Sequence, residues 1–102
     1  MGRRPDRTAR RKAERAARQT VRDRERLAKL VVGGSAERPI EVPASSVIAV
    51  RARATPCPQC EGTLHIEEEQ APSALVRRVV VRCQRCGVGR DLWFRIAVAR
   101  PS

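Results

Sequence analysis

The four cysteines of this chain are its residues best suited to chemistry. Cys57 and Cys60 form one Cys-x-x-Cys pair, Cys83 and Cys86 form another, and twenty-two residues separate the two pairs. Cysteine thiolates bind Zn²⁺ well, and four of them complete a tetrahedral site that leaves no position for water. The spacing therefore predicts one structural zinc ion held by all four cysteines.

Two other uses of these thiols remain open at this stage. A Cys-x-x-Cys pair can perform thiol redox chemistry, but such pairs belong at the start of a helix, and no helical pattern follows either pair here. Four thiolates can also hold a single iron, as in rubredoxin. The aromatic core of rubredoxin has no counterpart in a chain with one Trp, one Phe and no Tyr.

The residues around the cysteines predict the turns and strands that would bring the two pairs together. Gly62 and Gly87 follow the pairs and suit backbone with positive φ. Alternating apolar residues predict strands over 63–69, 75–82 and 92–98. The apolar residues expected to share a face within each strand are Leu64 and Ile66, then Leu75, Val79 and Val81, then Leu92, Phe94, Ile96 and Val98. Nearby cations to balance the thiolate charge would come from Arg82, Arg85 and Arg90.

The two cysteine motifs and the hairpin between them resemble the zinc ribbon family over residues 55–98. The first knuckle reads Cys-Pro-x-Cys-x-Gly and the second reads Cys-x-x-Cys-Gly. The resemblance implies a three-stranded antiparallel module around one structural zinc ion. Members of the family bind DNA, RNA or proteins, so the resemblance implies no single task. The acidic hairpin tip of transcript-cleavage ribbons is missing, because the nearest acidic run, 67–69, falls within a predicted strand.

The N-terminal segment predicts one long basic helix over 5–32. Asp6 or Thr8 would cap its start, and Gly33-Gly34 would stop it. The chain up to Leu30 holds twelve basic and four acidic residues. Because apolar residues are concentrated near the end of the segment, we expect the last two turns to dock on the rest of the protein and the earlier turns to be exposed and frayed.

The charge of the whole chain raises the question of its partner. The net charge is +11 and the pI is about 11.4, which favours a polyanion such as DNA or RNA. Three interpretations of the N-terminal helix stay open. It could be a solvated arm, an arm that binds nucleic acid, or a helix that docks on a protein partner through Ala13, Thr20 and Leu27, which recur every seven residues. An arginine-raising bias in a GC-rich coding sequence would also produce this charge.

The candidate nucleic-acid contacts fall into two groups. In the N-terminal arm they are Arg10, Arg11, Arg15, Arg18 and Arg22. In the predicted ribbon they are Arg78, Arg82, Trp93 and Arg95, which alternate onto the face away from the apolar side chains. An aromatic ring among arginines could stack a base and hold its phosphate. The alternative is that Trp93 only covers a thin sheet.

The predicted fold is a small α+β protein in three parts. These are a basic helical arm over 1–32, a linker over 33–54 and a zinc ribbon over 55–99. Within the linker, the β-branched stretch 47–53 could add an extra strand to the ribbon.

The function expected from the sequence is binding. The lone His65 has no nucleophile or base partner in sequence, and no phosphate-binding loop is visible, so we expect no enzymatic activity and no small-molecule substrate. No apolar run reaches the roughly 20 residues needed to span a membrane. Without a signal-peptide pattern, we expect a cytoplasmic protein with reduced thiols.

Overall fold

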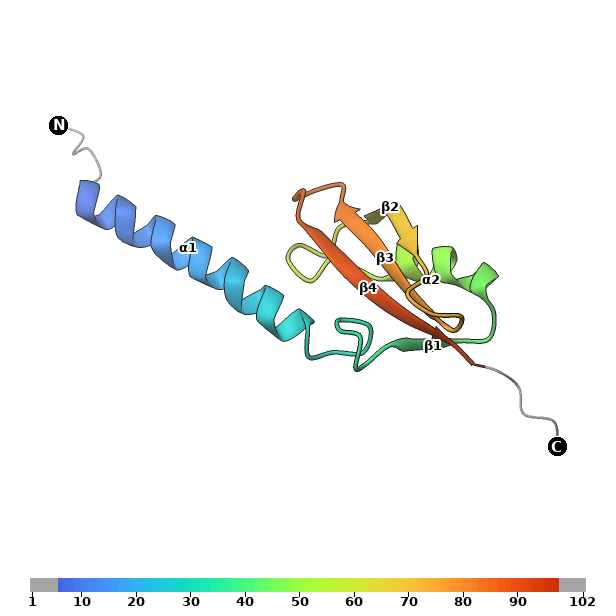
Figure 1. The fold of residues 1–102 in the computed structure, drawn as a ribbon. Coiled ribbons are helices and arrows are strands. Elements are labelled where there is room, and N and C mark those ends of the chain that lie inside the picture. The colour runs from blue at the N-terminus through green and yellow to red at the C-terminus, as the bar shows by residue number, and fades with distance from the viewer. Residues whose placement is uncertain (1–5, 98–102) are drawn as a thin grey trace.

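A long N-terminal helix and a four-stranded mixed sheet make up this small α+β protein (Figure 1). The structure is a computed structural model and describes residues 6–97. A short helix covers one face of the sheet. The long helix projects from the end of the sheet opposite to the one where β4 ends.

The long helix α1 spans Arg7–Ala28. Asp6 is its N-cap and accepts a hydrogen bond from the backbone N–H of Thr8 at 3.1 Å, which confirms one of the two predicted caps. The helix ends earlier than predicted, with Lys29 as its C-cap. Gly33, at φ +90°, is used instead to fold the chain onto the sheet, where its carbonyl accepts from the N–H of Trp93 at 2.9 Å.

The sheet has the strand order β1-β4-β3-β2. Its strands are β1 (Ile40–Val42), β2 (Leu64–Gln70), β3 (Val76–Cys83) and β4 (Gly89–Ile96). The last three are the predicted antiparallel strands, and Val98 at the end of the third prediction lies outside the described residues. β1 was not predicted, and it pairs in parallel with β4 through the register Ile40↔Phe94. β2 is the other edge of the sheet and carries the three glutamates 67–69.

The prediction of a strand over 47–53 is wrong, because this stretch is helical. A 3-10 turn over Ser45–Val47 leads into helix α2, Ile48–Ala54. Ile48 and Ala52, four residues apart, are buried against the sheet, while Val50 is 65% exposed. The apolar residues of this stretch therefore follow the helical period, and packing against the sheet outweighs the strand preference of the β-branched residues.

The core lies between α2 and one face of the sheet. It includes most of the apolar residues predicted to share a face, with Ile66 and Ile96 partly buried against it, and it includes Cys57 and Cys83. Leu75, predicted on the same face as Val79, is 37% exposed. Its buried residues are Ile40, Val42, Ile48, Ala52, Cys57, Leu64, Val79, Val81, Cys83, Leu92 and Phe94. So small a core leaves the cysteine cluster as an integral part of the packing.

Helix α1 docks on the loop before β2 by polar contacts instead of apolar ones. The Gln59 amide nitrogen donates to the Val21 carbonyl at 2.8 Å and to Glu25 Oε1 at 2.9 Å, and Arg24 donates to the Gln59 carbonyl at 3.0 Å. The apolar residues expected to make the contact stay largely outside, with Leu27 62% and Val32 67% exposed. Docking is therefore confined to one side of the helix, near its end. The first turns, which were expected to fray, are helical from Arg7 onward.

Candidate metal centre

The first knuckle is a tight turn over Cys57–Cys60. The Cys57 N–H donates to the Gly62 carbonyl at 3.0 Å, and the Glu61 N–H donates to the Cys57 carbonyl at 2.7 Å. The Gln59 N–H points at the Cys57 sulfur, 3.4 Å away. Positive φ falls on Glu61, at 62°, and not on Gly62 as the sequence predicted.

Gly62 is required because there is no room for a side chain at this position, and not because its backbone needs a positive φ. A Cβ at this position would lie 2.9 Å from the Cys83 sulfur, 3.0 Å from the Arg85 Cβ and 3.2 Å from the Cys60 sulfur. Such contacts are closer than real Cβ atoms tolerate without a shift of their neighbours. A side chain here would therefore push apart sulfurs from the two knuckles.

The second knuckle repeats the turn at the end of β3. The Cys83 N–H donates to the Val88 carbonyl at 3.1 Å, and the Gly87 N–H donates to the Cys83 carbonyl at 3.0 Å. Gly87 takes the positive φ predicted for it, at 77°. The Cys83 sulfur faces the N–H groups of Arg85 and Cys86 at 3.3 and 3.4 Å, which are donors suited to a thiolate.

The sheet brings the two knuckles together. Leu64 at the start of β2 pairs with Cys83 at the end of β3, and the Gln84 N–H donates to the Thr63 carbonyl at 3.0 Å. All four cysteine sulfurs lie within 4.8 Å of one another, with 3.7 Å between those of Cys57 and Cys86. Bonds of about 2.3 Å to a tetrahedral zinc ion put sulfurs roughly 3.8 Å apart. The four cysteines thus form a cluster that could hold a metal ion.

Without a metal, the thiols of the second knuckle differ in acidity. Backbone hydrogen bonding, above all from the N–H of Cys86, lowers the pKa of Cys83 to about 6 against the desolvating effect of burial. The Val88 N–H lowers the pKa of Cys86, but burial and the three neighbouring thiols outweigh it and raise that pKa to about 11. Cys83 therefore offers a thiolate at neutral pH, and a bound cation would favour ionisation of Cys86.

The three arginines expected to flank the site do contact the knuckles. Arg85 donates to the Cys60 carbonyl at 3.3 Å, and Arg82 donates to the Gly87 carbonyl at 2.7 Å. Arg90 is the most buried of them, with 7% of its side chain exposed, and its Nη2 lies 4.0 Å from the Cys57 sulfur. Its Nε is buried and has no hydrogen-bond partner among residues 6–97. A buried guanidinium at this place offsets the negative charge of the thiolates.

The predicted nucleic-acid contacts lie on two separate surfaces. Arg11, Arg15, Arg18 and Arg22 are exposed on α1 and share one face, since they recur at helical spacing. Arg10 is exposed on the neighbouring flank, 3.8 Å from Glu14. We call the first four the arginine stripe.

The sheet residues of that prediction lie on the face away from α2. Arg78 pairs with Asp91 at 2.7 Å, and its guanidinium lies 5.9 Å from the centre of the Trp93 ring. Arg82 pairs with Glu67 of β2, while Arg95 is exposed. Trp93 is half-buried, so it partly packs and partly remains open. Two of the three sheet arginines thus already have acidic partners.

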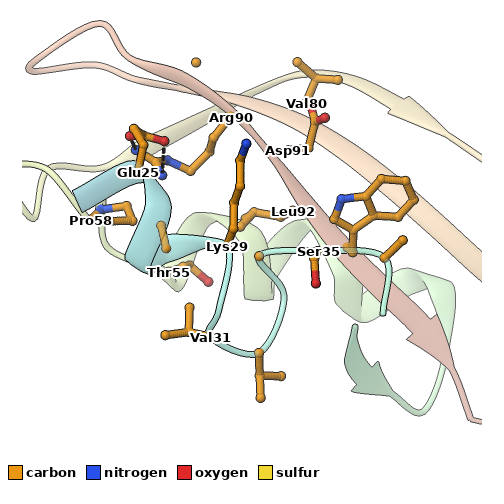
Figure 2. A pocket seen from close by; sticks show the side chains of 16 residues that line it. Glu25, Lys29, Val31, Ser35, Thr55, Pro58, Val80, Arg90, Asp91 and Leu92 are labelled. Atoms are coloured by element: carbon orange, nitrogen blue, oxygen red, sulfur yellow. Dashed lines mark hydrogen bonds and ion pairs between the residues drawn. The ribbon is translucent and has the colours of Figure 1, made fainter. Parts of the chain in front are cut away.

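A groove that sequence analysis did not anticipate lies between the end of α1, the following turn and the outer face of β4. It has a volume of about 700 Å³. Figure 2 shows the Lys29 side chain extending from the end of α1 into it, with Glu25 and Arg90 on one side and Asp91 on the other. Trp93 and Val80 also line it. The groove forms because the turn after α1 folds back beside β4, and no residue pattern in the sequence signals that arrangement.

Two further findings concern membrane spans and known proteins. Among helices of the described residues, none combines the length and apolar character needed to cross a membrane. Comparison with protein families, with curated proteins and with solved structures finds no match to this chain. The functional argument therefore rests on the residues and their geometry.

Proposed function

We propose that this protein is a small zinc ribbon that binds nucleic acid through the arginine stripe of α1. The zinc ion is structural, the activity is binding without a catalytic step, and the ribbon serves to hold the helix in place. The observation that carries the proposal is the arginine stripe itself, exposed on a helix whose first turns stand clear of the sheet (Figure 1).

Zinc is favoured over other metals by the ligand set. Four cysteine sulfurs within 4.8 Å suit a soft tetrahedral ion, and the N–H groups that face Cys57 and Cys83 are the donors that a thiolate centre needs. Four thiolates leave no position for a reacting water, which supports a structural role. Metal analysis of the purified protein tests this assignment: one zinc per chain is expected, and one iron with a red chromophore would contradict it.

Nucleic acid is favoured by the distribution of charge on α1. Within residues 6–97, the ion pairs of this helix are Arg10–Glu14, Asp23–Arg26 and Glu25–Arg90, and none involves the arginine stripe. A row of exposed guanidinium groups can contact successive phosphates and release their counterions. Such binding is independent of sequence and falls steeply as salt is raised.

A salt titration with matched variants tests the binding proposal. Arg15→Gln/Arg18→Gln removes two charges from the stripe, and Arg51→Gln/Arg53→Gln removes two from exposed positions of α2. With an oligonucleotide as ligand, the stripe variant should lower the slope of log K against log salt by about 1.4–1.8, and the α2 variant should not change it. Equal losses in both variants would assign the binding to net charge alone, and absence of binding at low salt would refute the proposal.

A second candidate function is a protein-interaction module. It is favoured by the apolar residues left outside at the end of α1 and in the turn after it, namely Leu27, Leu30, Val31 and Val32. Exposed apolar residues that are contiguous often mark protein contacts. This candidate would take precedence if no polyanion bound at low salt.

A further inference from the structure

The groove beside α1 has the size and composition of a ligand site. Its volume of about 700 Å³ lies within the range of roughly 300–1,000 Å³ that is typical of small-molecule and cofactor pockets. Trp93 and Val80 line it on the side of the sheet, and Ala28 and Lys29 line it on the side of α1. It therefore combines an aromatic ring, apolar surface and a cationic side chain.

The other charged residues that line the groove are held in ion pairs, so Lys29 is the cation that a ligand can meet. Glu25 is held by Arg90 through contacts of 2.6 and 3.1 Å, and Asp91 is held by Arg78 at 2.7 Å. Within residues 6–97, Lys29 makes none of the ion pairs, and its side chain extends into the groove (Figure 2). The groove therefore favours an anionic ligand.

The arginine stripe leads to this groove. Lys29 follows Arg22 by seven residues, and it keeps helical backbone with φ −72° and ψ −17°. Positions seven apart lie on one face of a helix, so Lys29 continues the line of the stripe. Between Arg22 and Lys29 this face carries Glu25, which contacts Gln59 of the first knuckle. A strand bound to the stripe therefore passes beside the first knuckle before it reaches Lys29 and the groove.

We propose that the groove takes an unpaired nucleobase, which stacks on Trp93 while its phosphate contacts Lys29. This inference rests on the proposed function and names its substrate class: single-stranded nucleic acid. A base within a duplex is already stacked and paired and cannot enter a groove, whereas the bases of a single strand are free to stack on aromatic side chains. Arg78 lies against the same ring and is fixed there by Asp91 and by Gln70 at 3.3 Å, which supports the orientation of the indole.

Intrinsic fluorescence provides a direct test, because Trp93 is the only tryptophan in the chain. The probes are a single-stranded thymidine oligonucleotide, a duplex of equal length, inorganic polyphosphate and poly-glutamate. The single strand should quench Trp93 fluorescence and bind about 5- to 100-fold more tightly than polyphosphate at equal charge. The duplex and polyphosphate should bind the stripe without quenching.

Variants locate the effect in the groove. Trp93→Leu should reduce affinity for a dye-labelled single strand about 5- to 100-fold and leave polyphosphate binding unchanged, whereas Trp93→Phe should retain most of the single-strand affinity. Lys29→Gln should weaken the single strand without changing the fold. If Trp93→Leu fails to fold, the quenching of the unmodified protein decides the question.

The outcomes separate this inference from the proposed function. Equal affinity for single strand, duplex and polyphosphate, without quenching, would overturn the base site and leave the binding of nucleic acid by the stripe intact. Quenching by poly-glutamate but not by the oligonucleotide would overturn it in favour of an acidic peptide in the groove. Absence of binding to every polyanion would overturn both.

Discussion

Glu25 and Arg90, sixty-five residues apart in sequence, form a two-point ion pair that joins helix α1 to the cysteine cluster. Arg90 Nη2 reaches Glu25 Oε1 at 2.6 Å and lies 4.0 Å from the Cys57 sulfur. The same guanidinium therefore faces both the helix and the cysteine cluster. Through it, the position of the arginine stripe depends on the integrity of the knuckles.

Removal of Glu25 should destabilise the protein. Glu25→Ala leaves the Arg90 guanidinium buried without its carboxylate, because only 7% of that side chain is exposed, and we expect a loss of about 1–3 kcal/mol in the free energy of unfolding. Glu14→Ala is the matched control, since Glu14 lies on the same helix in an exposed pair and should cost less than about 1 kcal/mol. Urea denaturation followed by Trp93 fluorescence measures both, and equal losses would show that the buried pair has no special part in stability.

Arg90 should also tune the affinity for metal. Arg90→Gln removes the cation nearest to the Cys57 sulfur and should weaken zinc binding about 10- to 100-fold in a chelator competition assay. Arg95→Gln removes an exposed arginine from the same strand and should leave the affinity unchanged. A zinc affinity that is the same for both variants would contradict a role of Arg90 at the centre.

The two knuckle glycines should respond differently to substitution. Gly62→Ala places a Cβ 2.9 Å from the Cys83 sulfur and should lower zinc affinity about tenfold or more. Gly87→Ala meets no atom within 4 Å but must adopt a φ of +77°, so it should cost about 1–2 kcal/mol of stability with little change in affinity. Chelator competition and thermal unfolding separate the two effects. The reverse pattern would contradict the conclusion that Gly62 is needed because a side chain does not fit there and that Gly87 is needed for its positive φ.

Metal removal should unfold the sheet. Treatment with a chelator and a reductant should collapse the amide chemical-shift dispersion of β2, β3 and β4 and shift Trp93 emission to the red, because the cysteines are part of a small core. One equivalent of zinc should restore both signals. A dispersed spectrum that persists after complete removal of metal would show that the sheet is stable by itself.

Local sequence patterns predicted the cysteine cluster and the antiparallel strands well. The Cys-x-x-Cys spacing and the apolar alternation around Val79 and Phe94 reflect contacts between strands that are neighbours in sequence. The cysteine cluster and the buried strand faces that they predicted both appear in the structure. The zinc ion, nucleic-acid binding and cytoplasmic location stay predictions.

Long-range contacts account for the errors. The stretch 47–53 is helical because Ile48 and Ala52 need the helical period to reach the sheet, a choice that its composition does not reveal. β1 was missed because three residues are too few to show alternation, and their pairing with β4 depends on the turn at Gly33. The polar docking of α1 was missed because Gln59 and Glu25 are far apart in sequence and unremarkable by themselves.

The acidic strand β2 has a consequence for the behaviour of the protein at high concentration. The backbone of an edge strand can recruit another chain and start aggregation. Here three consecutive glutamates and a bulge between Ile66 and Glu68 lie on that edge, so a second copy that approached edge to edge would meet like charge and an irregular ladder. β2 is thereby protected from intermolecular strand addition, so we expect copies of the protein to stay separate at high concentration.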